Sequence, residues 1–392
     1  MSSPFTVGPK GDKPRSDLRV TFSKNSSPLK VSIQSKVESL YGDSIKESVL
    51  QTCDELEVST GLLEIDDYGA LPFVISARVE AAIKKAYPNN KNVALPELKS
   101  FCTHTSSRFR FRRSRLYLPG NQPKLMLNAG IHKPDGLILD LEDAVSPLEK
   151  DDTQYLVRNV LRSLDFMGAE RMVRINQGEQ GLQDLEFVIP HNVHLILIPK
   201  VESADQVKQV DTKIHEIAQR WGRKDPVYLM PILESGRGIL KALEIAEASE
   251  NTVALAIGLE DYTADIGVQR TLDGRESFFA RSMLINAARA AGIQAIDTVF
   301  SDVSDEEGLR TSVREAKTLG FDGKGCIHPR QIKPIHEEFA PTDAEVEKAQ
   351  KIVTAFQEAE AKGLGVVALG NKMIDPPVVK RALRILDLNN SK

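Results

Sequence analysis

GLILDLEDAVSP, residues 136–147, passes from a continuous apolar run into three carboxylates, Asp140, Glu142 and Asp143. The apolar run predicts a strand that is buried on both faces, as in a parallel sheet. Negative charge concentrated beside a buried segment is costly unless cations or a metal ion balance it. The stretch therefore predicts a parallel strand whose carboxyl end lies in a charged site.

Seven other runs of the same kind occur after Ser114, and helical periodicity fills most of the gaps. Seven gaps are long enough for a crossover helix, which favours a (β/α)8 barrel (TIM barrel), in the α/β class, over residues 114–392. An open doubly wound sheet is the alternative, but no Gly-x-Gly-x-x-Gly follows the first strand and no Walker sequence is present. The eight runs are RLYLP, GLILDLE, RMVRIN, HLILIPK, VYLMPILE, VALAIGLED, AIDTVF and GKGCIHP.

Composition excludes several classes of protein. The 51 basic and 55 acidic residues among 392 give no overall field for binding nucleic acid or a membrane surface. Three cysteines without a CxxC spacing argue against a disulfide scaffold and a zinc site. No apolar run is long enough to span a membrane and the first residues lack an export signal, so we expect a cytoplasmic protein.

The segment before the barrel predicts a small α+β unit over residues 1–87. Residues 1–16 are rich in Gly, Pro, Lys and Ser, which predicts a mobile arm. A strand at LRVTF, a helix near residues 36–56, and then a strand, a turn at residues 67–69, a second strand and a closing helix follow. Residues 88–113 lack strong structure and predict a linker, whose basic end at residues 108–115 is either a solvated face or a phosphate contact.

Polar side chains end most of the predicted barrel strands. In a (β/α)8 barrel these carboxyl ends converge on one face, where such folds keep their active sites. Carboxylates without thiol or imidazole partners favour Mg²⁺ over transition metals. Each residue also has a structural alternative, such as a helix cap or an ion pair with a nearby cation, and a structural role is favoured for His328. The strand-end residues are Asp140, Glu142, Asp143, Arg174, Asn176, Lys200, Glu234, Glu260, Asp261 and His328.

The motifs of the barrel segment resemble, in order, those of the beta subunit of citrate lyase and of the malyl- and citramalyl-CoA lyases, in the HpcH/HpaI aldolase family. The resemblance implies an oxo-acid-lyase that cleaves a 3-hydroxyacyl thioester into an acetyl thioester and a 2-oxo acid such as oxaloacetate. It also implies a trimer or a multiple of one. The motifs are RSRLYLPGN, DLEDAVSPLEK, RIN, LIPKVES, ILESGRG, GLEDYTADIG, GFDGKGCIHPRQI and GNKMIDPPVV.

The same resemblance implies roles for individual residues. Glu234 and Asp261 would bind Mg²⁺, with Glu142 and Asp143 beside the metal and its waters. Arg174 would hold the substrate carboxylate, and we also assign Arg115 and Lys124 to substrate binding. Asp375, contributed by a neighbouring subunit, would act near the thioester, although it could instead be only the N-cap of a helix beginning at Pro376.

Residues 12–87 resemble the acyl-carrier gamma subunit of citrate lyase, in which a serine carries a phosphoribosyl-dephospho-CoA arm. This chain departs from the family pattern, because Arg15 stands where the modified residue is expected and Ser16 follows it. Ser16 is therefore the predicted attachment site. A carrier fused to a lyase would raise the local concentration of its thioester.

Three hypotheses follow. The chain is a lyase that acts on a thioester carried by its own N-terminal domain, or a lyase for free CoA thioesters with a degenerate carrier domain. The third is a non-catalytic scaffold that recruits an acyltransferase subunit. The sequence does not distinguish citryl, citramalyl and malyl groups, which differ by one small substituent.

Overall fold

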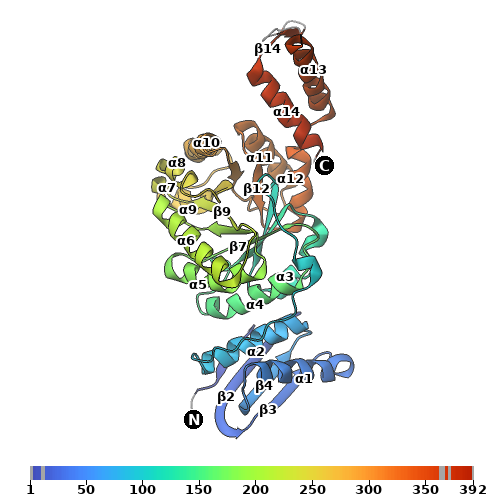
Figure 1. Ribbon diagram of the computed structural model, residues 1–392, viewed down its shortest axis with the longest axis vertical. Coiled ribbons are helices and arrows are strands. Elements are labelled where there is room, and N and C mark those ends of the chain that lie inside the picture. Colours follow the sequence, from blue (N-terminus) through green and yellow to red (C-terminus); the bar gives the residue numbers. More distant parts are fainter. Residues whose placement is uncertain (1–2, 10–13, 362–366, 370–371, 391–392) are drawn as a thin grey trace.

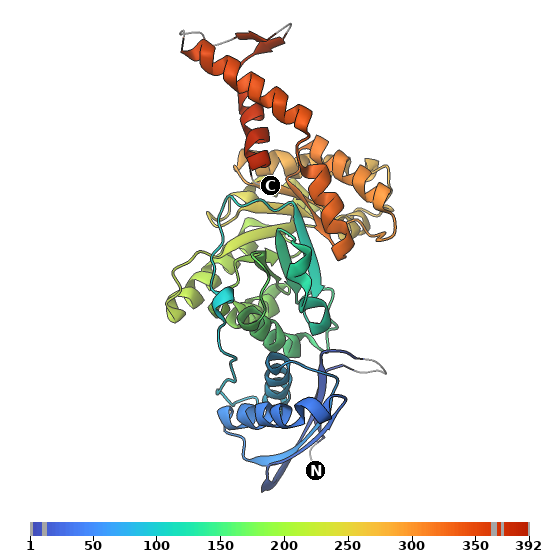
Figure 2. The same cartoon turned by 90° about the vertical axis from the view of Figure 1, so that its right-hand side faces the viewer.

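The computed structural model describes residues 3–9, 14–361, 367–369 and 372–390. A small N-terminal domain, a central barrel and a C-terminal arm follow one another along the chain. The N-terminal domain and the arm lie on opposite sides of the barrel (Figures 1 and 2). Among the described residues, none of the helices combines the length and apolar character that crossing a bilayer requires.

Eight parallel strands close the central barrel in chain order, which confirms the predicted (β/α)8 fold. Each predicted run contains one strand: β5 (Ser114–Pro119), β6 (Gly136–Asp140), β7 (Glu170–Arg174), β8 (Leu195–Ile198), β9 (Tyr228–Leu233), β10 (Ala254–Ile257), β11 (Gln294–Asp297) and β12 (Gly323–Cys326).

Helices surround this barrel on its outside (Figure 1). They are α3 (Pro123–Met126), α4 (Lys150–Ser163), α5 (Gly178–Val188), α6 (Ala204–Trp221), α7 (Gly236–Leu240), α8 (Ala242–Ala246), α9 (Leu259–Asp265), α10 (Arg275–Ala290), α11 (Glu306–Leu319) and α12 (Ile332–Phe339). Four short 3-10 turns add to them: η1 (Ser100–Cys102), η2 (Ala129–His132), η3 (Ile189–His191) and η4 (Pro329–Gln331).

The barrel interior is apolar over most of its depth. Ile138, Met172, Leu197 and Met230 belong to one buried cluster contributed by neighbouring strands. Successive residues of a strand point to opposite faces, so the same strands also send apolar side chains outward against the helices. The polar strand-end side chains lie beyond this cluster, at the carboxyl ends of the strands, whereas Arg115 of β5 is buried in contact with Met230 of the cluster.

The N-terminal domain contains a four-stranded sheet in the order β1-β2-β4-β3. Its strands are β1 (Phe5–Val7), β2 (Leu18–Pro28), β3 (Lys30–Ser35) and β4 (Thr60–Asp67), and its helices are α1 (Glu38–Glu55) and α2 (Pro72–Ala86). The prediction of a mobile arm over residues 1–16 is wrong for Phe5–Val7, which pair antiparallel with Val20–Phe22. Residues 1–2 and 10–13 lie outside the described residues.

The second strand predicted after the turn at residues 67–69 is also wrong, because α2 begins there. Pro72 occupies the first turn of the helix, where its missing N–H costs nothing. The β-branched and aromatic residues that suggested a strand are buried around most of the helix. A helix that is covered on several sides loses the amphipathic pattern that identifies it in sequence.

Residues 88–113 have little regular structure, but they are bonded to the barrel along much of their length. Asn192 Nδ2 donates to the carbonyl oxygens of Cys102 and His104, and Arg162 Nε donates to that of Pro96. Arg112 is fully buried, with Nε 2.7 Å from Glu170 Oε2. The prediction that the basic end is a solvated face is therefore wrong at Arg112, which forms a buried ion pair instead.

The C-terminal arm consists of α13 (Asp343–Glu360), β13 (Val367–Leu369), β14 (Lys372–Ile374) and α14 (Pro376–Asn390). The two helices pack on each other around a small core of their own that includes Ile352, Val353 and Val379. Arg384 of α14 pairs with Asp322, which directly precedes β12. The arm is therefore fixed near the amino end of a barrel strand.

Candidate functional site

A cavity of about 380 Å³ opens at the carboxyl ends of the barrel strands. Strands on several sides of the barrel contribute to it, so residues far apart in sequence meet there. Its polar lining includes Arg115, Tyr117, Asp140, Asp143, Arg174, Glu234, Glu260, Asp261 and Asp297. This is the face at which barrel enzymes keep their active sites.

Arg174 and Asp140 form the central ion pair of the cavity. The parallel register places the two residues opposite each other at the ends of β7 and β6. Arg174 Nε donates to Asp140 Oδ1 at 2.7 Å and Nη2 donates to Oδ2 at 2.6 Å, a two-point contact. The same carboxylate accepts the backbone N–H groups of Glu142 and Ala144. Burial alone would lower the pKa of Arg174, but Asp140 more than compensates and raises it.

Glu142 and Asp143 lie on the other side of the same guanidinium. Arg174 Nη1 lies 3.0 Å from Glu142 Oε2 and 3.6 Å from Asp143 Oδ2. Gln177 donates to Glu142 Oε1 at 2.9 Å. Glu142 is buried, which raises its pKa, whereas Asp143 is half exposed. The carboxylates of the 136–147 segment are thus held mainly by one arginine.

Lys200 is the second cation of the site. Its ammonium lies 3.6 Å from Glu142 Oε1, 3.7 Å from Asp143 Oδ1 and 3.5 Å from Asp261 Oδ1. Burial would lower the pKa of Lys200, but these carboxylates raise it above its ordinary value. The backbone of Lys200 adopts a left-handed φ of 49°, a conformation that non-glycine residues rarely hold.

Glu234 is the carboxylate least favourable to ionise. It is only 6% exposed, and burial, with a further contribution from Asp261, raises its pKa to about 7. Its Oε2 accepts the backbone N–H of Lys200 at 2.9 Å. Gly258 leaves room for it, because a Cβ there would come within 2.3 Å of Glu234 Oε1.

Arg115 lines the cavity from β5 and is 1% exposed. One amino group contacts Met230 Sδ at 2.9 Å, and Nε has no hydrogen-bond partner among the described residues. Burial lowers the pKa of the guanidinium. A buried cation with an unpaired donor is costly unless an anionic or polar group meets it.

The structure brings Arg115, Glu142, Asp143, Arg174, Glu234 and Asp261 together at this site. Lys124 is exposed on α3, and Ser16 lies in the N-terminal domain. Asp375 Oδ1 accepts the backbone N–H of Val378 at 3.1 Å, so Asp375 caps α14. Among the described residues, no hydrogen bond or ion pair joins Asp375 to the cavity of its own chain.

Sequence reasoning gave no role to three contributors. The sequence predicts Lys200 only as a strand-end residue, makes no prediction for Gln177, and does not identify Asp140 as the partner of Arg174. The strand-end positions of Asp140 and Lys200 were the available signals. Their partners could not be predicted, because strand register and loop conformation decide them.

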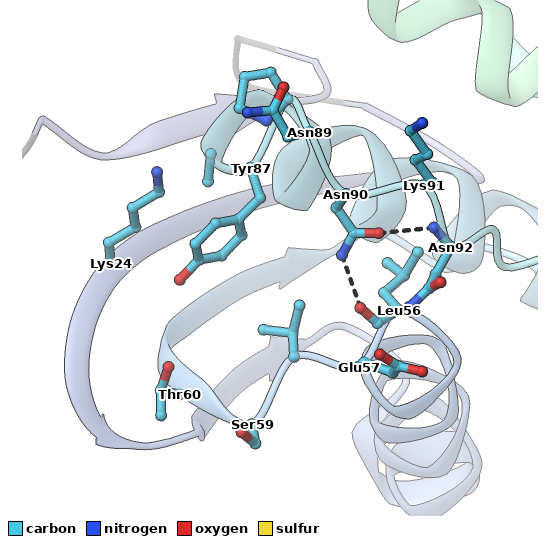
Figure 3. Close-up of a pocket in the computed structure, with 13 residues that line it drawn as sticks. Lys24, Leu56, Glu57, Ser59, Thr60, Tyr87, Asn89, Asn90, Lys91 and Asn92 are labelled. Atoms are coloured by element: carbon cyan, nitrogen blue, oxygen red, sulfur yellow. Dashed lines mark hydrogen bonds between the residues drawn. The ribbon is translucent and has the colours of Figure 1, made fainter.

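A larger cavity, of about 610 Å³, lies on the N-terminal domain (Figure 3). Lys24 and Tyr87 form one side, and the segment from Leu56 to Thr60 forms another. Its lining contains none of the predicted site residues, and Lys24 lies far along β2 from Ser16. The strand-end carboxylates, rather than cavity size, therefore identify the candidate active site.

Two family models match the chain. Residues 113–329 match HpcH/HpaI aldolase/citrate lyase, and residues 11–86 match malonate decarboxylase delta subunit (MdcD), an acyl-carrier model. The second match falls on the domain that contains Ser16. Each match covers one of the two units joined by residues 88–113.

Curated relatives agree with the first match. The citrate lyase beta subunit of Haemophilus influenzae is 43% identical over 281 residues, covering 71% of this chain and 97% of that protein. The mitochondrial citramalyl-CoA lyase of Mus musculus is 31% identical, covering 76% of this chain and 95% of that protein.

A solved structure of CitE from Mycobacterium tuberculosis, in complex with magnesium, acetoacetate and coenzyme A, superposes with a TM-score of 0.60. It is 30% identical in sequence and covers 72% of this chain and all of that one. The similarity therefore extends over the barrel in both sequence and structure.

The pKa of Glu234 predicts how the stability of the metal-free protein depends on pH. The group has a pKa of about 7 when folded, against an ordinary value of 4.5, so between these values the folded state retains a proton that the unfolded state has lost. The free energy of unfolding should fall by roughly 3 kcal/mol over this range, relative to Glu234→Gln, and change little above it.

Urea unfolding at about pH 5 and about pH 8, with a chelator present, measures this difference. Glu234→Gln is the matched control, because it keeps the size of the side chain and an oxygen for the Lys200 N–H. Parallel pH profiles for the two proteins would contradict the assigned pKa.

Proposed function

Because this chain belongs to the HpcH/HpaI aldolase/citrate lyase family, we propose that it is a magnesium-dependent carbon–carbon lyase. Its substrate is a 3-hydroxyacyl thioester of the citryl type, carried on its own N-terminal domain. The products are an acetyl thioester and a 2-oxo acid such as oxaloacetate. The relatives are named as lyases, and two kinds of them, the citramalyl-CoA and malyl-CoA lyases, are named for CoA thioesters.

The imbalance of charge at the cavity is the observation that carries this proposal. Two lining carboxylates have cations of their own, since Glu260 pairs with Arg270 and Asp297 pairs with Lys324 and Arg281. The other five carboxyl groups meet three cationic side chains, so full ionisation leaves a deficit of positive charge among them: Asp140, Glu142, Asp143, Glu234 and Asp261 against Arg115, Arg174 and Lys200. Burial is the main cause of the raised pKa of Glu234, and the neighbouring negative charge of Asp261 adds to it. A divalent cation would remove the deficit.

The residues present fit magnesium. Among the described residues, no three His, Cys, Asp or Glu side chains are placed to bind a metal ion by themselves. Magnesium usually takes one or two carboxylates and fills its other positions with water and substrate oxygens. Glu234 and Asp261, which are carboxylates bridged by Lys200, would hold it. When bound, the metal would polarise the oxygen of the oxo-acid half of the substrate.

Arg174 and Arg115 would bind the anionic parts of the substrate. Asp140 fixes one edge of the Arg174 guanidinium and Glu142 contacts Nη1, so the N–H groups that these carboxylates leave free keep a constant direction. Such preorganised donors favour a transition state that develops negative charge. Arg115 offers a second buried cation with a free donor. Lys124, on exposed α3, would contact a distal anionic part of the thioester.

Bond cleavage requires two proton movements. The hydroxyl proton must leave as the electron pair of the carbon–carbon bond moves to the carbon next to the thioester, and a proton must then reach that carbon. Glu142 lies beside Arg174 and Asp143 lies beside Lys200, and these carboxylates would accept the first proton through a water molecule. Asp375 of a neighbouring subunit would deliver the second proton to the carbon next to the thioester. A neighbouring subunit is needed because, within its own chain, the C-terminal arm that contains Asp375 is fixed near the amino end of β12.

The match of residues 11–86 to an acyl-carrier model supports a carrier-bound substrate. Ser16 is partly exposed, and its backbone N–H donates to the Tyr68 carbonyl oxygen at 3.1 Å. A phosphoribosyl-dephospho-CoA arm attached there would hold the acyl group. The alternative is a free CoA thioester, which the coenzyme A in the similar CitE structure favours.

We further propose a cytoplasmic homotrimer, or a multiple of one, which works with a citrate lyase alpha-like acyltransferase. Cys53, Cys102 and Cys326 are free and buried, consistent with a reducing compartment. Large apolar side chains are exposed along α7, α8 and α10, where neighbouring copies would pack: Leu240, Leu243, Phe278 and Phe279.

Glu234→Gln and Asp261→Asn should each reduce kcat/KM for the thioester on the order of 100-fold or more, because each removes a ligand charge. Chemical denaturation should show no loss of stability, since both changes relieve repulsion between carboxylates. Isothermal titration with MgCl2 should show weaker binding in both variants. Activity that survives EDTA, with normal rates in both variants, would contradict the metal assignment.

Asp375→Asn and Glu234→Gln should complement each other if the active site combines two subunits. If the two variants are mixed in equal amounts and assemble at random into cyclic trimers, about one interface in four pairs a barrel that has Glu234 with a neighbour that has Asp375. Refolding or co-expressing the two inactive variants should therefore restore about a quarter of the wild-type rate. A mixture that exchanges subunits, shown by mass spectrometry, but stays inactive would rule out the shared site.

Expression with the arm-attaching enzymes should add the mass of the prosthetic arm to the wild type but not to Ser16→Ala. Intact-mass measurement detects this difference directly. Ser16→Ala should lose citrate-dependent turnover and keep the rate on added CoA thioesters, because the barrel is unchanged. Efficient cleavage of free CoA thioesters by an unmodified wild type would instead establish the degenerate-carrier alternative.

A further inference from the structure

The N-terminal domain is fixed to the barrel along α2 and α4. Arg158 of α4 contacts Glu80 of α2 with Nη2 2.6 Å from Oε2, and both side chains are almost completely buried. Lys85 Nζ lies 2.6 Å from Asp152 Oδ2. Asn159 Nδ2 donates to the Phe73 carbonyl oxygen at 3.0 Å. Buried ion pairs of this kind require a definite geometry, so the domain is docked rather than tethered.

One contact of this interface involves the residue next to Ser16. Asp17 is 4% exposed and Arg78 is 3% exposed. Arg78 Nε donates to Asp17 Oδ1 at 3.0 Å and Nη2 donates to Oδ2 at 2.8 Å. The same Nη2 also donates to the carbonyl oxygen of Asn121 at 3.0 Å. One guanidinium nitrogen thus connects the segment that begins at Ser16 to the barrel.

Asn121 belongs to the loop between β5 and α3, at the carboxyl end of β5. The N–H of the preceding residue, Gly120, donates to the Asp140 carbonyl oxygen at 2.8 Å. Gly120 packs so closely that a Cβ there would lie 2.6 Å from that oxygen. Asp140 is the carboxylate that holds Arg174, so the loop that Arg78 contacts lies at the rim of the candidate active site.

We propose that Arg78 is a positioning residue that fixes the Ser16 turn against the β5–α3 loop, at the carboxyl face of the barrel. The N-terminal domain then presents an acyl thioester on Ser16 from one constant position. Ser16 itself is held in a left-handed conformation, with φ 56°, between its bond to Tyr68 and the buried Asp17. The delivery role rests on the proposed carrier function, whereas the fixed position of Ser16 does not.

Two substitutions isolate this contact. Arg78→Lys keeps a cation beside Asp17 but loses the planar guanidinium, whose Nε and Nη2 contact the two oxygens of Asp17 while Nη2 also contacts Asn121. The double variant Arg78→Met/Asp17→Asn removes the cation together with the charge that it neutralises, which avoids leaving a buried unpaired carboxylate. Lys85→Met is the matched control, because it breaks an ion pair of the same interface that does not involve the Ser16 segment.

A spin-label distance measures the position of Ser16 without any need for the prosthetic arm. The three native cysteines are buried, so Ser16→Cys and Leu125→Cys can be labelled selectively; Leu125 is 43% exposed on α3. Labelled chains diluted with unlabelled ones should give a narrow distance distribution, in the parent and in Lys85→Met. Both Arg78 variants should give a broad one. A distribution that stays narrow in both Arg78 variants would overturn the proposal.

Kinetics tests the delivery role. With equal arm mass on Ser16, the Arg78 variants should turn over the carrier-bound thioester at least tenfold more slowly than the parent, with an unchanged rate on the free CoA thioester. Equal loss in Lys85→Met, or no loss in the Arg78 variants, would show that Arg78 does not position the substrate. If the parent protein carries no prosthetic group on Ser16 after expression with the arm-attaching enzymes, both the carrier function and the delivery role are refuted. The spin-label distance distribution would still decide whether Arg78 fixes the Ser16 turn.

Discussion

The ion pair between Asp140 and Arg174 is the contact on which the rest of the site depends. The register of β6 and β7 places the two residues opposite each other, and a one-residue shift of either strand would turn its own member of the pair away from the barrel interior. Asp140 uses both of its oxygens on the arginine, which leaves the opposite side of the guanidinium for Glu142. The apolar barrel that sets the strand register therefore also determines the direction of the cation at its end.

The barrel could be predicted from the sequence because its strands are buried on both faces and carry continuous apolar runs. The same reasoning found the strand-end carboxylates, since the fold brings those ends together. It failed for β1 and β3, which are short or mostly exposed, and for the beginning of α2, whose first residues favour a strand although the closing helix itself was predicted. Pairs such as Arg112 with Glu170 depend on tertiary structure alone.

The site stores charge in an unfavourable arrangement. Glu234 is buried near other carboxylates, and the ammonium of Lys200 balances several of them at distances longer than a direct hydrogen bond. A protein under selection for stability alone would gain by replacing some of these groups. Retaining them is understandable where a cation and an anionic substrate complete the balance, because binding then supplies the missing partners.

The two additions to the barrel meet it at different places. The N-terminal domain covers α4 and reaches the loop that follows β5, whereas the arm is bonded beside the residue that precedes β12 (Figures 1 and 2). The described parts of both additions lie away from α7, α8 and α10 (Figure 1). The N-terminal domain is therefore joined to this barrel at a place apart from the C-terminal arm and from the apolar surface proposed for subunit contacts. The fusion adds a fixed position for Ser16 and leaves the apolar surface proposed for subunit contacts uncovered by the described part of the N-terminal domain.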